Sequence, residues 1–386
     1  MFPKTPVAWL QLSREKIRLM VAIAGITFAD VLMFMQLGFQ DALYDVNTSI
    51  HRSLQADLIL ISPQTKSISY MESFSRRRLY QSLAFEGVKS ASSLYINKTS
   101  WQNPQNHQNY AILMLGFDPK KLVINLPDVN YNVDKLKSPD VVLFDRASRP
   151  EFGNATITEK FEQGKIVTTE VNKRRVKVGA LFTVGPSFSA DGNLIVSDLT
   201  FLRIDRNRNP EEIDVGLITI KPGADAQKVQ ASLEAYLPKD VKVVTRQGFV
   251  DLETEYWANS TPIGFIFGLG VTMGFVVGAV IVYQVLYTDV SDHLAEYATL
   301  KAIGYSDIYL LSIVFQEALI LAVLGYIPGA VICLGLYDLT KSATFLPLVM
   351  TVARATIVLV LTVLMCLIAG AIAMRKLQDA DPADIF

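Results

Sequence analysis

Four long apolar runs constrain this chain more than any other feature of its sequence. One run lies near the N-terminus, and three lie together toward the C-terminus. A membrane-spanning helix needs about 20 mostly apolar residues to cross about 30 Å of hydrocarbon. All four runs reach that length. We therefore predict transmembrane helices at residues 19–40, 262–287, 308–337 and 355–374.

The polar segment between the first and second runs, residues 41–255, is predicted to be one large domain outside the membrane. Short runs rich in Val and Ile and bounded by Asn, Asp, Gly and Pro predict strands, for example DLILIS at 57–62. Helical patterns lie between them, for example DAQKVQASLEAYL at 225–237. The mixture predicts an α+β domain. The expected fold is thus a membrane protein with four transmembrane helices (1+3) and a large α+β domain inserted between helices 1 and 2.

Composition and motifs exclude several classes of function. The net charge of −1 and the lack of a long basic stripe argue against a nucleic-acid partner. The sequence has no G-x-x-x-x-G-K-[ST] motif, so it cannot bind ATP as a P-loop protein does. Its three histidines show no metal-ligand spacing, and no G-x-S-x-G nucleophile motif occurs. We expect no catalytic residue, cofactor or metal site in this chain.

Charge around the first run predicts the orientation. The first 18 residues hold four Lys or Arg, and such residues favour the cytoplasmic side. An even number of spans puts both termini on that side. We predict a cytoplasmic amphipathic helix within residues 1–18, a cytoplasmic tail at 375–386, and the large domain on the opposite side. A simple extension of the first transmembrane helix remains an alternative for residues 1–18.

The second transmembrane run is rich in glycine at helical spacing. Small residues let helix backbones approach closely in lipid, so overlapping GxxxG pairs indicate a packing face. Homodimerisation is the simplest use of such a face. The predicted dimer-packing residues are Gly264, Gly268, Gly270, Gly274 and Gly278.

Two carboxylates fall inside the apolar runs, Asp30 and Glu317. A charge at the bilayer centre costs about 2.5–3.5 kcal/mol on insertion scales. We therefore expect both intramembrane polar side chains to face protein or water rather than lipid.

The connection at residues 288–307 is the longest predicted cytoplasmic loop. Leu294, Tyr297, Ala298 and Ala302 lie on one face of a helix here. Such a face would fit an apolar groove on a partner protein. The alternative is a helix that only lies on the membrane surface.

The same loop carries a family resemblance. DHLAEYATLKAIGYS at 292–306, followed by a helix with the pair Gln316–Glu317, resembles the MacB/FtsX family of ABC-transporter permeases. The tail RKLQDADPADIF is similar to the family's ending, with Asp381, Pro382 and Ala383 matching. Within the family, the FADVLMFMQLGFQ run of the first helix is most similar to the cyanobacterial DevC group. Asp30 in this run departs from the broader family.

The resemblance implies a permease that transmits motion and binds no nucleotide itself. ATP and Mg would be held by a partner ABC ATPase, which would dock on residues 288–307. The implied coupling residues are Leu294, Glu296, Tyr297, Ala298, Lys301, Ala302 and Gly304. Two copies of the chain would form a homodimer in the membrane lipid. The implied location is a bacterial, cyanobacterial inner membrane, with the large domain in the periplasm.

The resemblance also implies partners outside the membrane. The periplasmic domain would comprise a porter-core-like part at 41–120 and 206–255 and an inserted subdomain at about 121–205. It would work with a membrane-fusion (periplasmic adaptor) protein and a TolC-like outer-membrane protein in a tripartite system. The exported cargo would be a lipid, a glycolipid or another amphiphile.

Other functions remain open at this stage. One alternative is an FtsX-like regulatory subunit that activates a periplasmic cell-wall hydrolase, but a simple activator tends to have a smaller outer domain. A membrane enzyme is disfavoured by the missing catalytic constellation. A sensor is disfavoured by the short cytoplasmic segments.

Overall fold

The computed structural model describes residues 7–344 and 346–374. The chain divides into two compact units. Residues 1–42 and 262–386 form the membrane unit, and Leu43–Thr261 form the extramembrane domain. Each unit is considered by itself. The predictions for residues 1–6 and for the tail at 375–386, including Asp381, Pro382 and Ala383, lie outside the described residues.

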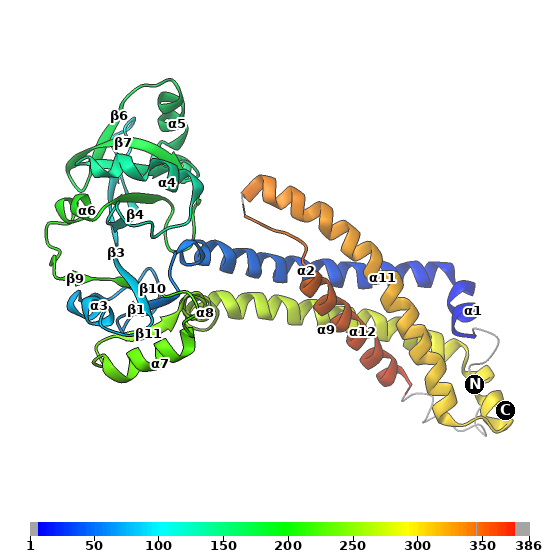
Figure 1. Ribbon diagram of the computed structural model, residues 1–386. Helices are drawn as coiled ribbons and strands as arrows, with labels where there is room; N and C mark the ends of the chain where they lie inside the picture. The colour runs from blue at the N-terminus through cyan, green and yellow to red at the C-terminus, as the bar shows by residue number, and fades with distance from the viewer. Residues whose placement is uncertain (1–6, 345, 375–386) are drawn as a thin grey trace. The chain divides into compact units, whose positions relative to one another are not determined.

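The membrane unit contains four helices that are long and apolar enough to cross a membrane (Figure 1). Two short helices accompany them, α1 and α10. Four membrane helices with a large domain between the first and the second confirm the fold class expected from the apolar runs. The bounds are α1 Val7–Arg14, α2 Lys16–Ser53, α9 Pro262–Asp292, α10 Leu294–Ala302, α11 Asp307–Thr344 and α12 Val352–Ala373.

All four spans are longer than the apolar runs alone predict. Helix α2 has 38 residues, and a rise of 1.5 Å per residue makes it about 57 Å long. Only about 30 Å of hydrocarbon needs crossing. The last part of α2, from Leu43 to Ser53, belongs to the extramembrane domain. This helix is therefore one of the two chain segments that join the two units.

The extramembrane domain is built on a mixed, mostly antiparallel sheet of nine strands in the order β11-β1-β10-β3-β4-β8-β5-β7-β6. Two neighbouring pairs are parallel, β4 with β8 and β5 with β7. A separate small sheet pairs β2 with β9. The bounds are β1 Leu58–Ile61, β2 Phe74–Ser75, β3 Val88–Gln102, β4 Asn109–Phe117, β5 Val141–Asp145, β6 Val167–Val171, β7 Arg174–Phe182, β8 Asn193–Ser197, β9 Glu212–Ile213, β10 Val215–Ile220 and β11 Lys242–Thr245.

Strand β3 holds the large sheet together. Its first half, Val88–Leu94, pairs with β10, and its second half, Leu94–Gln102, pairs with β4. Near its end, Trp101 also pairs with Val171 of β6, the last strand in the order. The strands from β3 to β6 therefore close into a ring, while β11, β1 and β10 extend the sheet from the other half of β3.

Helices cover both faces of this sheet, so strands such as β1 are apolar on both sides. Leu58 and Leu60 belong to one buried cluster, which includes side chains of α3, α6 and α7. Ile59 and Ile61 belong to the opposite cluster, which includes side chains of α2, α4 and α8. The helices of the domain are α3 Arg77–Ser82, α4 Pro127–Asn132, α5 Asn154–Glu162, α6 Asp198–Ile204, α7 Ala226–Tyr236 and α8 Arg246–Asn259, with 3-10 helices at Val133–Lys137 and Pro150–Phe152.

Local chemistry fixes several of these elements. Asp225 caps α7 by accepting from the backbone N–H groups of Gln227 and Lys228, and Thr245 caps α8 in the same way. Gly116 on β4 lets α6 approach closely, because a Cβ there would lie 2.7 Å from that of Phe201. Helix α3 before β3 is short, with only Arg77–Ser82 α-helical.

Trp101 provides a test of the ring of strands. Its indole stacks on Phe144 with ring centroids 4.7 Å apart, and its Nε1–H donates to the Phe152 carbonyl at 3.1 Å. The side chain is fully buried. Trp101→Ala should lower the free energy of unfolding of this domain by about 3–5 kcal/mol, because it removes a large buried side chain. Urea unfolding of the full chain, followed by circular dichroism, measures this.

Tyr131→Ala is the matched control, because the side chain of Tyr131 is 90% exposed. It should change the free energy of unfolding by no more than about 0.5 kcal/mol. Equal effects of the two substitutions would contradict the role given to Trp101.

Candidate functional site

The predicted coupling segment is largely helical. Helix α10 covers Leu294–Ala302 and exposes Glu296. Tyr297 and Ala298 are only 1% and 5% exposed, and Tyr297 shares a buried cluster with side chains of α1, α9 and α11. The prediction that these two side chains face a partner protein is therefore wrong. The middle of the helix's apolar face is covered by the chain's own membrane helices, while Leu294 is half-buried and Ala302 is exposed.

The exposed part of the segment is the turn between α10 and α11. Ile303 and Ile308 are 71% and 78% exposed, and Tyr305 is 45% exposed. Ala302, Gly304 and Ser306 are exposed as well. We call residues 302–306 together with Ile308 the coupling turn. The coupling turn thus exposes large apolar side chains at a tight reversal of the chain. A turn of this kind could insert into a groove on another protein.

Gly304 shapes the coupling turn. It has a φ of +104°, which side-chain-bearing residues rarely adopt. Its N–H donates to Lys301 O, and the N–H of Tyr305 donates to Leu300 O. This pair of bonds is the Schellman pattern that ends a helix at a left-handed glycine. Gly304 therefore has a structural role in the coupling segment.

A charged cluster lies where α2, α9 and α11 come together in the membrane unit. The Arg18 guanidinium contacts Glu15 at 2.8 Å, Asp292 at 2.6 Å and Asp289 at 3.6 Å. His293 follows as the residue before α10, and its Nδ1 lies 3.0 Å from the Asp289 carbonyl oxygen. These contacts tie the start of α2 to the end of α9 and to the base of α10.

Glu317 lies near Asp289 of this cluster and is fully buried. Both belong to the membrane unit, on α11 and α9. Asp30, the other carboxylate expected inside the membrane, is also 0% exposed and accepts a hydrogen bond from the Thr362 hydroxyl on α12. Gly329 of α11 packs against Asp30, since a Cβ there would lie 2.9 Å from that of Asp30. Both carboxylates are thus surrounded by protein within the helix bundle.

A second polar site was not foreseen from the sequence. Arg354, in the first turn of α12, is 4% exposed and donates to Asp41 of α2 at 2.6 Å. It also donates to the Val349 carbonyl at 2.8 Å and lies over the ring of Tyr337. The Tyr337 hydroxyl in turn donates to the Phe34 carbonyl of α2. The fourth transmembrane helix was predicted to begin one residue after Arg354. The only sign of this polar site in the sequence was therefore a basic residue at the edge of an apolar run.

The glycine face of α9 packs within the chain. A Cβ at Gly270 would meet Gln36, one at Gly274 would meet Met33, and one at Gly278 would meet Ala29 and Met365. These neighbours belong to α2 and α12. The assignment of these three glycines to a dimer interface is corrected: the close approach that they permit is used by the chain's own helices. Gly268 has no atom within 4 Å of a Cβ and Gly264 is half-buried, so a dimer contact there stays a prediction.

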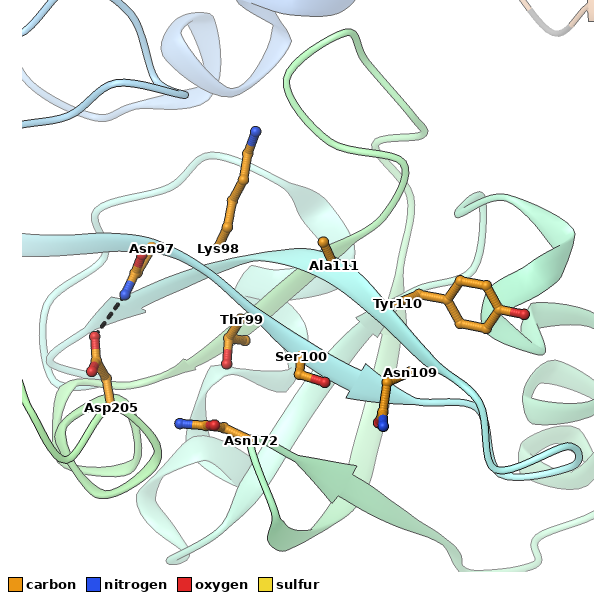
Figure 2. A pocket seen from close by; sticks show the side chains of 9 residues that line it. All are labelled: Asn97, Lys98, Thr99, Ser100, Asn109, Tyr110, Ala111, Asn172 and Asp205. Atoms are coloured by element: carbon orange, nitrogen blue, oxygen red, sulfur yellow. Dashed lines mark hydrogen bonds between the residues drawn. The ribbon is translucent and has the colours of Figure 1, made fainter.

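The extramembrane domain has a shallow pocket of about 430 Å³ on β3 and β4 (Figure 2). Among its side chains, Asn97 donates to Asp205 at 2.7 Å, while Lys98 extends away from them. No catalytic pair is formed there. Across residues 7–344 and 346–374, no three His, Cys, Asp or Glu side chains could hold a metal ion. The pocket is lined by Asn97, Lys98, Thr99, Ser100, Asn109, Tyr110, Ala111, Asn172 and Asp205.

The packing of α9 can be tested with two glycines of the same helix. Gly278→Leu should destabilise the single chain, because the added side chain has to displace Met365 and Ala29 in a packed interior. We expect a loss of about 1–3 kcal/mol, seen as a lower melting temperature in detergent. Gly268→Leu is the matched control and should leave the melting temperature unchanged. A melting temperature lowered only by Gly268→Leu would contradict this packing.

The Arg354–Asp41 contact can be tested by a double-mutant cycle. Alanine at either position removes the same ion pair, so the double variant should be less destabilised than the two single effects combined. We expect a coupling of about 0.5–3 kcal/mol in the free energy of unfolding. The exposed pair Arg52–Asp45 is the control, with an expected coupling of about 0–1 kcal/mol. Equal coupling free energies in the two pairs would show that the burial of Arg354 does not strengthen its ion pair with Asp41.

Comparison with known proteins finds one family model, described as FtsX-like permease C-terminal, that matches residues 264–382. The match includes α9 to α12 with the coupling turn, and it leaves α2 and the extramembrane domain outside. The comparison with curated protein sequences finds no match.

Three solved structures are similar to this chain. The periplasmic region of MacB from Actinobacillus actinomycetemcomitans is 13% identical, with a TM-score of 0.35, and covers 54% of this chain and 96% of its own. The extracellular domain of YknZ, a noncanonic ABC-type transporter from Gram-positive bacteria, is 10% identical, with a TM-score of 0.31. The similarity covers 50% of this chain and 100% of the YknZ domain. A domain of a putative permease protein from Porphyromonas gingivalis is 13% identical, with a TM-score of 0.31. The similarity covers 50% of this chain and 89% of that domain. These TM-scores are too low to support an argument about function, so the FtsX-like permease match over residues 264–382 is the finding that bears on what the chain does.

Proposed function

We propose that this protein is the permease subunit of an ABC transporter that works by mechanotransmission, as the MacB-like resemblance implies. The observation that supports it is the FtsX-like permease match, because the matched residues contain three of the four membrane helices and the coupling turn. The chain has no P-loop of its own, so the ATP and Mg would be bound by a partner ABC ATPase.

The coupling turn is the proposed docking site of the ATPase. Its two exposed isoleucines, Ile303 and Ile308, would enter an apolar groove on the ATPase. Because Tyr297 anchors α10 inside the membrane unit, a push on the turn would be passed to the helix bundle. The contacts of Arg18 with Asp289 and Asp292 would carry the same motion to α2.

The large domain would then receive this motion on the other side of the membrane. Only α2 and the α8–α9 connection join the two units, so any movement of the bundle has to reach the domain through these segments. In this proposal the domain lies in the periplasm of a bacterial, cyanobacterial cell and acts with a periplasmic adaptor and a TolC-like outer-membrane protein. The permease would be a homodimer in the inner membrane.

The proposed cargo is a lipid, a glycolipid or another amphiphile, as the similarity of the first helix to the DevC group implies. Within the described residues, several buried polar side chains of the bundle are paired with other protein groups. Asp30, for instance, is paired with Thr362. An arrangement of this kind favours export driven by the outer domain over passage of a solute between the helices.

The docking site is tested by the double variant Ile303→Asp and Ile308→Asp. Both side chains are exposed, so the variant should fold and insert normally while it loses the copurifying ATPase. Affinity purification from membranes, with the ATPase activity measured on the purified complex, gives the readout. We expect at least a tenfold loss, because a buried charge in an apolar interface costs more than about 1.4 kcal/mol.

Two further variants complete the test. Tyr131→Asp adds a charge at an exposed site of the extramembrane domain and should keep the ATPase bound. Tyr297→Asp should instead reduce the amount of folded protein, since that side chain is buried in the chain itself. Normal ATPase recovery with the Ile303→Asp and Ile308→Asp variant would show that docking occurs elsewhere.

A further inference from the structure

Four aromatic side chains form a continuous surface at one end of the extramembrane domain. Tyr256 and Trp257 lie in the last turn of α8, and their rings meet with centroids 5.5 Å apart. Tyr70, in the loop after β1, lies 5.8 Å from Tyr256. Phe188, in the loop between β7 and β8, stacks on Trp257 at 5.3 Å. We call these four residues the aromatic surface.

One carboxylate fixes the three chain segments that carry these rings. Glu253 is fully buried, and its oxygens accept from the Trp257 Nε1–H at 2.7 Å and from the Ile68 backbone N–H at 2.7 Å. The Ser189 hydroxyl donates to it at 3.4 Å. The donors are Trp257 itself, Ser189 next to Phe188, and Ile68 two residues before Tyr70. The aromatic surface is therefore a built and ordered feature, assembled from segments far apart in the sequence.

The aromatic surface remains uncovered within the extramembrane domain. Tyr70 is 60% exposed and Phe188 is 47% exposed. Trp257 is half-buried, and its single polar atom is already bonded to Glu253, so the part of the indole that solvent reaches is carbon. Exposed carbon of this extent is costly to leave in water and needs a partner.

The position of the aromatic surface along the chain indicates which partner. Trp257 precedes Pro262, the first residue of the membrane-spanning helix α9, by five residues. Five residues reach at most about 18 Å even when fully extended. Trp and Tyr are enriched at the boundary between hydrocarbon and water, where an apolar ring with one polar atom is favoured.

We propose that the aromatic surface of Tyr70, Phe188, Tyr256 and Trp257 binds the surface of the lipid bilayer, with its rings at the level of the headgroups and upper acyl chains. The extramembrane domain then has a lipid contact of its own, beyond its two covalent connections to the membrane unit. This contact does not depend on an ATPase or on the nature of the cargo.

Tryptophan fluorescence tests the proposal. The chain has three tryptophans. Trp9→Phe removes the one in α1 and leaves Trp101, which is fully buried, and Trp257. This variant is reconstituted into phosphatidylcholine vesicles whose acyl chains carry bromine at carbons 6 and 7, and its emission is compared with that in unbrominated vesicles. We expect a loss of up to about half of the emission, since one of the two remaining indoles would lie at the lipid interface.

Two controls assign the signal. Adding Trp257→Phe to Trp9→Phe should abolish the quenching, because Trp101 is out of reach of lipid. Adding Tyr236→Trp to that double variant places an indole on α7 at a site that is 61% exposed but outside the aromatic surface, and its emission should not be quenched. Near-ultraviolet circular dichroism verifies that each variant is folded.

The outcomes separate the partners. Quenching that requires Trp257 supports the bilayer as the partner. If Trp257 is not quenched by the brominated lipid, the proposal is overturned. In that case, protection of Trp257 from the soluble quencher acrylamide would identify a protein, such as a second copy of this chain, as the partner. Equal quenching of the Tyr236→Trp variant would also overturn it, since contact would then not be specific to the aromatic surface.

Discussion

Hydrocarbon provides no hydrogen-bond partner for a polar group, and this constraint governs the structure of the membrane unit. Backbone groups meet it by forming helices. Side chains meet it by pairing inside the bundle, as Asp30 does with Thr362 and as Arg354 does with Asp41 and Tyr337. The Asp30–Thr362 and Arg354–Asp41 pairs join α2 to α12, the first span to the last, and the Arg354–Tyr337 pair joins α12 to α11. Residues that would be costly alone in lipid thus specify which helices are neighbours, a task for which interchangeable apolar side chains are poorly suited.

The membrane helices could be predicted because length and hydropathy suffice to define a span. The same information could not say what each helix face contacts. The glycines of α9 show this limit: their spacing correctly indicates close packing, but a second copy of the chain and a neighbouring helix of the same chain satisfy the spacing equally well. Only the positions of α2 and α12 in the structure show that these glycines pack against helices of the same chain rather than against a second copy. The apolar face of α10 could likewise be recognised from the sequence. The burial of its Tyr297 against other helices of the membrane unit could not, because it depends on packing between segments far apart in the sequence.

Only some strands of the extramembrane domain could be predicted from the sequence. Strands buried on both faces, such as β1, are apolar throughout and stand out from the sequence. Strand β3 was missed, because residues such as Ser92, Asn97 and Lys98 interrupt any apolar pattern along it. It is held by pairing with β10, β4 and β6 and by buried side chains such as Tyr95 and Trp101, and these partners cannot be read from the sequence of the strand itself. Glu253 was also beyond prediction, since a buried carboxylate is recognised only by the donors around it.

The continuity of β3 has a mechanical consequence for the domain. One unbroken strand belongs to both halves of the large sheet, and Leu94 in its middle pairs with Val215 of β10 and with Phe117 of β4. Any bending between the two halves therefore has to pass through β3, at or near Leu94.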